Sequence, residues 1–552
     1  MQKQWIFPEK AYEGNIINYL LECREVVGPE AVEEYLSPNP RLTYEPFLLK
    51  GMKEASERIL SAIEKGERIC IYGDYDADGV CGVSLLKEIF AKLGADYTYY
   101  IPSRFDEGYG LNKDAIKKIK ERGTDLIVTV DCGSLSVDEV EYAKASGMDV
   151  IVTDHHNINE KPVSCILINP KQKDCPYPEK ELSGCGVAFK LAQAVQRKRP
   201  DLLCKADLNR ALDLVAIATV GDIVALTGEN RTMVKYGLRV INSGGRPGLS
   251  LLIKKVGLKE KEIKSEHLAY VIVPHLNAAG RMVSASAGVR LLTSDKEGEI
   301  EEITEELLYS NKDRKKLQET AYDEAVSKIE ALYSHDKFLV LELPDAHEGI
   351  TGIVAGKLKD RFTRPAIILT PTGDNKLKGT GRSIDGVNLY DILASCGHLF
   401  DKFGGHSGAC GFTMNSGNLA TLRMRLKESA DKIYKEDPSI FKAKLQIDAE
   451  LDSFGLSREL IFALEQMEPF GHRNPKPVFA FSGVSVSSPY YMGERQQHVR
   501  FEANGVSCVF FNEAERFREY FRAGNRVDIA GYPGINRWKG NEKIQFTVED
   551  MR

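Results

Sequence analysis

With 552 residues, of which 43% are hydrophobic and 28% charged, the chain can bury the cores of three or four globular domains. No stretch approaches the roughly 20 apolar residues that span a bilayer, and the N-terminus lacks the apolar run of a secretory signal, so we expect a cytoplasmic protein with no membrane segment. The net charge of −6 shows no basic excess of the kind that would by itself indicate nucleic-acid binding, although a local basic groove is compatible with it.

Strands and helices are predicted to alternate after an N-terminal helical segment, residues 1–50. This alternation predicts an α/β fold in which helices cover a parallel sheet, within a domain of residues 51–230. The predicted strands are 69–72, 97–101, 126–130 and 150–153, and the predicted helices are 79–93, 112–122 and 136–146.

The rest of the chain changes in character twice. Residues 231–335 are mainly helical and end in a charged stretch without Gly or Pro, 301–332, which predicts a long connecting helix. A smaller α/β domain is predicted over residues 336–440, and short strands separated by turns predict a β-barrel over residues 441–552. The elements predicted in the smaller domain are strands at 338–341 and 366–369, a helix over 352–361 and a glycine-dense loop over 404–411.

Three carboxylates follow the first predicted strand at alternate positions, in the sequence GDYDADG. In an extended segment Asp74, Asp76 and Asp78 would point the same way. Crowded carboxylates repel one another unless a cation neutralises them, so the motif predicts a metal site. An exposed acidic turn is the alternative; a helix–loop–helix calcium loop is disfavoured because its twelfth position, counted from Asp74, is Leu85 and not Glu.

Other predicted elements end in the same kind of residue. One strand runs into Asp131 and the next into Asp154, His155 and His156, while Asp222 follows the apolar stretch LVAIATVG. Because the carboxyl ends of parallel strands form one crevice, we expect these side chains to converge. Oxygen ligands with one or two imidazoles favour Mn²⁺ or Mg²⁺, and a pair of such ions can hydrolyse phosphodiesters, with Asp131 as the bridging ligand. The neighbouring histidine can contact the substrate phosphate or donate a proton.

The motifs DYDADG, DCG, DHH and GD, in this order and spacing, resemble the four metal motifs of the DHH phosphoesterase superfamily. Within it the chain is similar to the RecJ exonucleases. The resemblance covers residues from about 45 to 552 and includes VPHLNAAGRM (273–282), HEGITGIVAGKL (347–358), GTGRS (379–383), GGHSGACG (404–411) and PFGHRNPKPVF (469–479). The last motif is typical of the oligonucleotide-binding (OB) domain of RecJ.

The resemblance implies roles for particular residues. It implies that two cations, Mn²⁺ or Mg²⁺, are held by Asp76, Asp78, Asp131, His155 and Asp222, with Asp74, Asp154 and His156 in or next to this shell. It places Gly404, Gly405 and His406 in a DHHA1 domain that binds substrate. It also implies that Arg281 and Arg382 recognise a terminal 5′-phosphate, which the planar fork of arginine suits, together with Thr380 and Ser383. Two positions depart from the commoner pattern: Thr380 replaces a serine and Cys410 an alanine.

The function that the resemblance implies is degradation of single-stranded DNA from the 5′ end to mononucleotides, in DNA recombination and repair. It also implies that the chain works with a single-strand-binding protein and a helicase. Nothing in the sequence suggests an obligate oligomer, so we expect a monomer. Tyr109, Tyr390 and Phe403 are candidates for base stacking, with core packing as the alternative, and Arg537, Trp538 and Lys539 are a candidate patch on the barrel.

Two alternatives remain. The first is a DHH phosphodiesterase of short oligonucleotides or cyclic dinucleotides, although such chains are usually much shorter and lack the barrel. The second is a catalytically silent DNA-binding scaffold, which the presence of every expected ligand disfavours.

Overall fold

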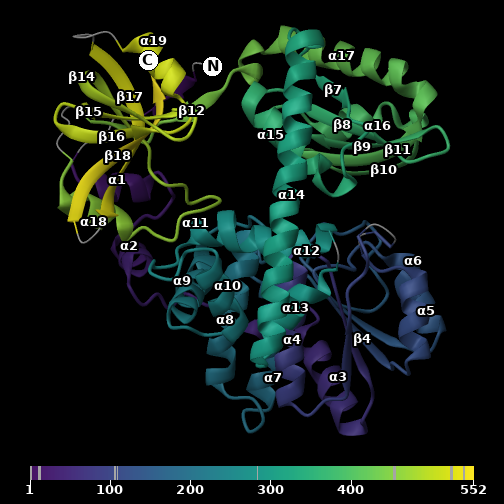
Figure 1. Ribbon diagram of the computed structural model, residues 1–552. Helices are drawn as coiled ribbons and strands as arrows, with labels where there is room; N and C mark the ends of the chain where they lie inside the picture. The colour runs from purple at the N-terminus through teal and green to yellow at the C-terminus, as the bar shows by residue number, and fades with distance from the viewer. Residues whose placement is uncertain are drawn as a thin grey trace. The chain divides into compact units, whose positions relative to one another are not determined.

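The computed structural model describes residues 3–9, 14–104, 107–108, 110–282, 284–451, 456–521, 526–538 and 541–552, without the side chains of 538 and 541 (Figure 1). The chain forms two compact units. The first consists of residues 1–20, 312–462 and 477–552, and the second of residues 21–311 and 463–476. All four aspartate motifs lie in the second unit.

The second unit contains the predicted parallel sheet, in the strand order β3-β2-β4-β5-β6. Successive residues of a strand point to opposite faces, so each strand contributes to two cores. Ile69 and Ile71 pack with helices α3, α4 and α7, whereas Cys70 and Tyr72 pack with α5 and α6. Figure 1 shows α5 and α6 on the opposite side of β4 from α3 and α4. The strands are β2 (Ile69–Gly73), β3 (Tyr97–Tyr100), β4 (Leu126–Val130), β5 (Asp149–Thr153) and β6 (Ile166–Ile168).

The predicted α/β fold is therefore confirmed. Each strand and helix predicted between residues 69 and 153 is present, with ends that differ by at most two residues. The helices of this unit are α2 (Pro29–Leu36), α3 (Met52–Lys65), α4 (Ala77–Lys92), α5 (Lys113–Glu121), α6 (Val137–Ala145), α7 (Gly184–Lys198), α8 (Lys205–Gly221), α9 (Gly228–Asn242), α10 (Pro247–Lys255), α11 (Ser265–His267), α12 (Val273–Met282) and α13 (Ser286–Thr293).

The long connecting helix predicted over 301–332 is also confirmed. Helix α14 (Glu297–Leu332) has 36 residues and begins four residues earlier than expected. Its first residues belong to the second unit and its residues from Lys312 onward to the first. It buries Ile300, Ile303 and Leu307 in the second unit, and Ala325 and Ile329 in the first.

The first unit contains a mixed sheet in the strand order β10-β11-β9-β8-β7, in which only β7 and β8 are parallel to each other. Its core packs against α15 and α17. The strands are β7 (Leu339–Glu342), β8 (Ala366–Pro371), β9 (Lys376–Arg382), β10 (Phe400–His406) and β11 (Ala409–Asn415), and the helices are α15 (Glu348–Phe362), α16 (Leu389–Ala394) and α17 (Leu419–Glu436).

The loop predicted over residues 404–411 is wrong, because this segment is a β-hairpin. Gly404 pairs with Gly411 and Gly405 with Cys410. Gly405 has φ +146°, and a Cβ there would lie 2.3 Å from the carbonyl oxygen of Ala409. Gly405 therefore permits close pairing of the two strands, whereas glycine density alone usually indicates a loop.

The predicted C-terminal β-barrel is confirmed as an OB-like ring. The strand order is β13-β14-β15-β16-β18-β17, and pairing of β14 with β17 closes the ring. The strands are β13 (Ala449–Glu450), β14 (Phe479–Met492), β15 (His498–Ala503), β16 (Val506–Phe510), β17 (Arg526–Trp538) and β18 (Asn541–Met551), with helices α18 (Arg458–Glu465) and α19 (Ala514–Tyr520).

The N-terminal fifty residues contain a strand as well as helices. Besides α1 (Ile16–Glu22) and α2, strand β1 (Gln4–Ile6) pairs in parallel with β12 (Lys444–Gln446). Trp5 lies in a small core with Ile447, Ala480 and Ala530, and its Nε1 donates a hydrogen bond of 2.6 Å to Asp550. Sequence reasoning missed this strand because its partner lies at the far end of the chain.

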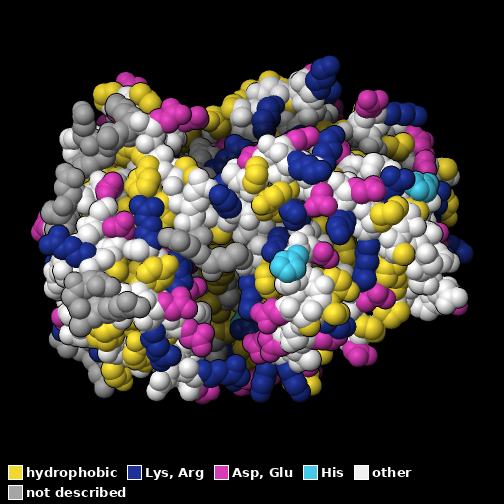
Figure 2. Space-filling view, turned by 90° about the horizontal axis from the view of Figure 1, so that it is seen from above, with side chains coloured by type: hydrophobic (Ala, Val, Ile, Leu, Met, Phe, Trp, Pro, Cys, Tyr) yellow, Lys and Arg dark blue, Asp and Glu magenta, His cyan; other side chains and the backbone are white. Residues whose placement is uncertain are grey.

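The surface carries both signs of charge, as the nearly balanced numbers of basic and acidic residues in the sequence suggest. Over the face that Figure 2 presents, basic and acidic side chains are interspersed. Within the described part of the chain, no helix combines the length and the apolar character that crossing a bilayer requires.

We expect Trp5→Ala to destabilise the barrel by about 3–5 kcal/mol, since it removes a buried aromatic side chain. Trp5→Phe keeps most of the apolar contact and loses only the hydrogen bond to the buried Asp550, which is worth about 1–3 kcal/mol. Hydrogen exchange of amides in β12 and β14 measures the effect, with β4 in the other unit as the reference. Equal exchange in all three proteins would show that β1 contributes nothing to the barrel.

Candidate metal centre

The alternation of the GDYDADG motif predicts that its three aspartates lie in one extended segment. This prediction is wrong, because a helix begins within the motif. Asp74 follows β2, but Asp76 is the N-cap of α4, where its carboxylate accepts hydrogen bonds from the amides of Asp78 and Gly79. Asp78 lies in the first turn of the helix. Helix capping therefore separates Asp78 from the other two carboxylates and directs it to a different set of neighbours.

Asp78 is fixed by the beginning of another helix. The amides of Gly184 and Cys185, at the start of α7, donate hydrogen bonds of 2.6 and 2.7 Å to its two oxygens. The amides and dipole at a helix N-terminus favour an anion there. Asp78 is buried, so these two donors help to keep a charge where water cannot.

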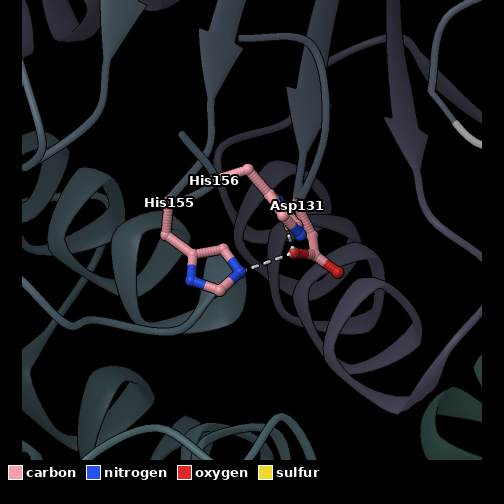
Figure 3. A group of neighbouring side chains, drawn as sticks. All are labelled: Asp131, His155 and His156. Atoms are coloured by element: carbon pink, nitrogen blue, oxygen red, sulfur yellow. Dashed lines mark hydrogen bonds and ion pairs between the residues drawn. The ribbon is translucent and has the colours of Figure 1, made fainter. Parts of the chain in front are cut away.

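Asp131 occupies the centre of the site, directly after β4. It is 2% exposed and has the left-handed backbone conformation, with φ +62°, which aspartate tolerates better than most residues. Its Oδ1 lies 3.1 Å from His155 Nε2 and 3.8 Å from His156 Nδ1. Figure 3 shows the side chains of His155 and His156 meeting the carboxylate of Asp131. Gly184 is required beside it, because a Cβ there would lie 2.5 Å from the Cβ of Asp131.

Asp154 orients the two histidines that follow it. Its carboxylate accepts hydrogen bonds from the amides of Ser134, His155 and His156, and lies 2.8 Å from His156 Nδ1. With its oxygens engaged in this way, Asp154 is better suited to position His156 than to bind a cation.

The side chains gather in three overlapping groups whose ligand atoms lie within 4.8 Å of one another. These are Asp74, Asp76 and Asp131; Asp131, His155 and His156; and Asp78, His155 and Asp222. Asp222, the residue that ends α8, lies 3.4 Å from His155 Nε2, and Asp78 lies 3.8 Å from the same atom. Asp131 and His155 each belong to two groups, which suits two neighbouring cations with shared ligands.

Burial and mutual repulsion dominate the electrostatics of this cluster. Burial raises the pKa of Asp131, of Asp78 and of Asp74, and the neighbouring carboxylates raise these values further. Burial and Asp76 raise the pKa of Asp222 to about 7. The folded chain thus holds carboxylates that ionise with difficulty unless positive charge is supplied.

The two histidines differ in charge. Burial and the adjacent His156 lower the pKa of His155 to about 3, so its ring is neutral, which is the form that binds a metal. Burial lowers the pKa of His156, but the bond to Asp154 and the nearby carboxylates outweigh this and raise it to about 9. His156 is therefore a cation at neutral pH, and its side chain is 39% exposed.

The donor set fits hard divalent cations. Oδ1 of Asp74 is buried without a hydrogen-bond partner, an arrangement that is unfavourable for a carboxylate oxygen unless a cation or water meets it. Carboxylate oxygens with one or two imidazoles are the ligands of Mn²⁺ and Mg²⁺, and no cysteine belongs to the three groups found among the described residues.

Sequence reasoning missed two residues that support this site. Asn277, in α12, accepts a hydrogen bond of 2.7 Å from the amide of Ala77 and so fixes the turn between Asp76 and Asp78. Gly184 both binds Asp78 and makes room for Asp131. Two signals in the sequence could have pointed to these residues. Asn277 lies in the motif VPHLNAAGRM, and the start of a helix at Ser183 and Gly184 indicates a site that can bind an anion. Neither signal predicts which residue is bound there.

A second group of predicted residues gathers in the first unit around β9. The hydroxyl of Thr351 lies 3.2 Å from that of Thr380, and a Cβ on Gly352 would lie 2.9 Å from the guanidinium of Arg382. The amide of Ser383 donates to the carbonyl oxygen of Gly408 in the hairpin turn. The motifs HEGITG, GTGRS and GGHSG thus meet at one place.

Within this second group the residues differ in accessibility. His406 is exposed at the surface, but its ring is partly shielded from water. This partial burial, together with the charge of Arg382, lowers the pKa of His406. Ser383 is buried and its hydroxyl donates to the carbonyl oxygen of Val387, so it holds the 383–387 loop.

Arg281 lies apart from this group, in α12 of the other unit, where its positive charge acts on Tyr75. Tyr109, the side chain of Trp538 and Lys539 lie outside the described residues, and Arg537 pairs with Glu542.

Comparison with known proteins identifies three domains in the chain. The DHH family, N-terminal domain, matches residues 68–219, the DHHA1 domain matches residues 335–432, and the RecJ OB domain matches residues 447–550. The single-stranded-DNA-specific exonuclease RecJ of Bacillus subtilis is 40% identical over 548 residues, which are 98% of this chain and 68% of that protein.

Two crystal structures of RecJ match the chain over its whole length. The crystal structure of RecJ in complex with Mn²⁺ from Thermus thermophilus is similar with a TM-score of 0.82 and 29% identity, over 100% of this chain and 79% of that one. RecJ from the same organism in complex with Mg²⁺ gives a TM-score of 0.75 with 28% identity, over 100% of this chain and 78% of that one.

We expect Mn²⁺ to raise the melting temperature of the metal-free protein, because cations that bind only the folded state stabilise it, by about 2.7 kcal/mol at a hundred times Kd. Asp131→Asn should raise the melting temperature without metal, since it removes a buried charge and asparagine tolerates the same backbone conformation. The same variant should lose most of the Mn²⁺-induced shift.

Calorimetry with and without Mn²⁺ measures both effects. Asp323→Asn, an exposed site on α14, is the matched control and should behave as the parent protein. An undiminished Mn²⁺ shift in Asp131→Asn would contradict the central place of this carboxylate in the metal site.

Proposed function

Because this chain belongs to the RecJ family of single-stranded-DNA-specific exonucleases, we propose that it hydrolyses single-stranded DNA from the 5′ end to mononucleotides with two divalent cations. The observation that carries this proposal is the convergence of buried carboxylates and a neutral histidine at one edge of the DHH sheet. The DHHA1 and RecJ OB domains in the same chain support a polynucleotide substrate.

In this proposal Asp76, Asp78, Asp131, His155 and Asp222 hold the cations, with Asp74 as a further ligand. When bound, two Mn²⁺ or Mg²⁺ ions activate water and stabilise the leaving oxygen of the phosphodiester. Asp131 and His155 each belong to two of the three ligand groups, and of these two only the carboxylate, with its two oxygens, would be shared between both cations. Cationic His156, fixed by Asp154, faces the substrate phosphate and contributes charge or a proton to it.

The residues around β9 are suited to bind phosphate groups of the strand. Arg382 and His406 supply donors at the surface of the hairpin, and Thr380 is half-buried beside them. We assign Arg281 and Arg382 to recognition of the terminal 5′-phosphate, since an arginine fork can donate two hydrogen bonds to phosphate oxygens. We assign Gly404 and Gly405 to the same substrate-binding hairpin: a Cβ on Gly404 would meet no atom within 4 Å, so the backbone there is open to substrate, and Gly405 permits the pairing of the two strands.

A role in recombination and repair, monomeric state, cytoplasmic location, and cooperation with a single-strand-binding protein and a helicase remain predictions of the sequence and the family resemblance. Two alternatives are less well supported. A phosphodiesterase of dinucleotides has no evident use for an OB domain, and a silent scaffold has no use for a cluster of carboxylates that is unfavourable without cations.

The central test follows a long 5′-labelled single strand during digestion. The parent protein with Mn²⁺ should release labelled mononucleotide from the first time points, leave the duplex intact, and prefer the long strand to a dinucleotide. Asp131→Asn should lower kcat by about a thousandfold or more, because metal-ion catalysis contributes several kcal/mol. Preference for the dinucleotide would favour the first alternative, and turnover by Asp131→Asn equal to that of the parent would refute the proposed site.

A separate test concerns the terminal phosphate. Arg382→Met should raise KM for a 5′-phosphorylated strand by about tenfold or more, since a hydrogen bond between charged groups is worth about 1.5–3 kcal/mol, and should leave KM for a 5′-hydroxyl strand nearly unchanged. Arg425→Met, an exposed arginine on α17, is the matched control. An equal change with both strands would show that Arg382 does not read the terminal phosphate.

A further inference from the structure

The motif PFGHRNPKPVF (469–479) resembles part of an OB domain, but most of it does not belong to the barrel. Residues 463–476 are part of the second unit, together with the metal centre, and the chain enters β14 of the barrel only at Phe479. We call residues 466–476 the strap. The strap is therefore a component of the unit that contains the metal ligands.

Asn474 fixes the shape of the strap. This residue is 1% exposed, and its side-chain Nδ2 donates hydrogen bonds to the carbonyl oxygens of Met467, at 3.1 Å, and Pro469, at 2.8 Å. Its Oδ1 accepts hydrogen bonds from the hydroxyl of Tyr35, at 2.8 Å, and from Nε of Arg24, at 3.2 Å. Two donors and two acceptors of a buried amide are thus engaged, so removing this side chain leaves several buried polar groups without a partner.

The strap is also attached to two helices of the second unit. Arg231 of α9, which is 3% exposed, donates hydrogen bonds to the carbonyl oxygens of Gln466, at 3.3 Å, and Glu468, at 2.8 Å. The hydroxyl of Ser265, in α11, donates a hydrogen bond of 2.6 Å to the carbonyl oxygen of Phe470. These bonds run to the backbone of the strap, so they fix its path along the unit.

The strap contacts the loop that follows Asp222. This loop, residues 223–227, leads from the C-cap of α8 to the start of α9. The amide of Leu226 donates a hydrogen bond of 2.9 Å to the carbonyl oxygen of His472. A Cβ on Gly471 would lie 2.6 Å from Cδ1 of Leu226, so the strap also packs closely against this buried side chain. The strap thus fixes the loop four residues after a predicted metal ligand.

The residue directly after Asp222 shows that the loop needs support. Ile223 has the left-handed backbone conformation, with φ +57°, which is unfavourable for a β-branched residue. Its side chain is 70% exposed, so its own packing does not hold this conformation. Support comes from further along the loop, where the strap binds Leu226 and Nδ2 of Asn230 donates a hydrogen bond of 3.1 Å to the carbonyl oxygen of Ala225.

We propose that Asn474 is a positioning residue for the metal ligand Asp222. Asn474 shapes the strap, the strap holds Leu226, and the loop thereby keeps the carboxylate of Asp222 in its group with Asp78 and His155. This inference rests on the proposed function, because it takes Asp222 as a ligand. Residues that orient metal ligands typically contribute about 10–100-fold to metal affinity or activity. Asn474 is buried, so it acts through Asp222 and not on the substrate.

Titration calorimetry of the metal-free full-length protein with Mn²⁺ tests the proposal. The parent should bind two cations, and Asp222→Asn should lose or strongly weaken one of the two binding events. Asn474→Ala should weaken the same event by about tenfold or more and leave the other within about twofold. Asn242→Ala is the matched control and should bind Mn²⁺ as the parent does, because this asparagine also bonds backbone atoms, but at the far end of α9.

A double-mutant cycle separates positioning from general stability. In the Asp222→Asn background, Asn474→Ala should weaken Mn²⁺ binding no further, because the strap then has no carboxylate to position. An equal loss in both backgrounds would overturn the proposal, as would parent-like Mn²⁺ binding by Asn474→Ala, even with a lowered melting temperature. If the parent binds no Mn²⁺, or if Asp222→Asn binds both cations as the parent does, the proposed metal centre itself fails, so the two failures are distinguishable.

Gly471→Ala tests the same contact should Asn474→Ala fail to fold. The three atoms nearest to the added methyl group would all belong to Leu226, so this variant presses on the loop and leaves Asn474 in place. Hydrogen exchange of the Leu226 amide, measured without metal, should be faster in Gly471→Ala than in the parent and unchanged in Asn242→Ala. Mn²⁺ binding should weaken at the event that Asp222→Asn affects. Parent-like Mn²⁺ binding by Gly471→Ala, together with faster exchange, would show that the strap holds the loop without positioning Asp222.

Discussion

The repulsion among buried carboxylates at the end of β4 is the constraint on which the catalytic unit depends. Asp131 is 2% exposed, and the negative charges of Asp78, Asp76 and Asp74 act on it. At separations of a few ångströms and low effective dielectric, such charges oppose folding by several kcal/mol unless they are protonated, bound by amides or met by cations. The chain supplies amides for Asp76, Asp78 and Asp154, whereas one buried oxygen of Asp74 has no hydrogen-bond partner. That oxygen of Asp74 is therefore a place where a cation is needed.

The surrounding fold explains how so unfavourable a cluster is held in place. The parallel sheet ends β2, β4 and β5 at one edge, which fixes three of the segments that contain ligands. Helices fix the others: the first amides of α7 bind Asp78, and Asp222 is the C-cap of α8. Arg246, which is 1% exposed, joins Glu88 of α4 to Asp213 of α8 and so ties together the two helices that present Asp78 and Asp222. The large apolar core below the site supplies the stability that the cluster lacks.

Much of this arrangement could be predicted from the sequence, and the exceptions share a cause. Strand and helix periodicity located the sheet, and the rule that parallel strands end at one edge brought Asp131 and His155 together. The alternation rule failed at Asp78, because an N-cap at Asp76 starts a helix and rotates the next carboxylate away. Asn277, Gly184 and strand β1 were missed because their partners are distant in sequence. The hairpin at 404–411 was missed because glycines that permit close strand pairing resemble those of a loop. Local patterns thus predict elements, whereas the contacts that adjust a site are long-range.

A cluster of aspartates and histidines that binds hard cations can hydrolyse many phosphodiesters, so the DHH unit alone does not define the substrate. In the proposed function, the features that distinguish a DNA strand are found elsewhere: the phosphate donors assigned around β9 and a closed OB-like ring. These features bind groups that recur along a polynucleotide, namely phosphates and flat bases, and their contacts add along the strand. A dinucleotide could satisfy few of them at once. In the proposed function, the metal centre of the DHH unit supplies generic hydrolysis, and the DHHA1 and OB domains supply most of the contacts that select a long single strand.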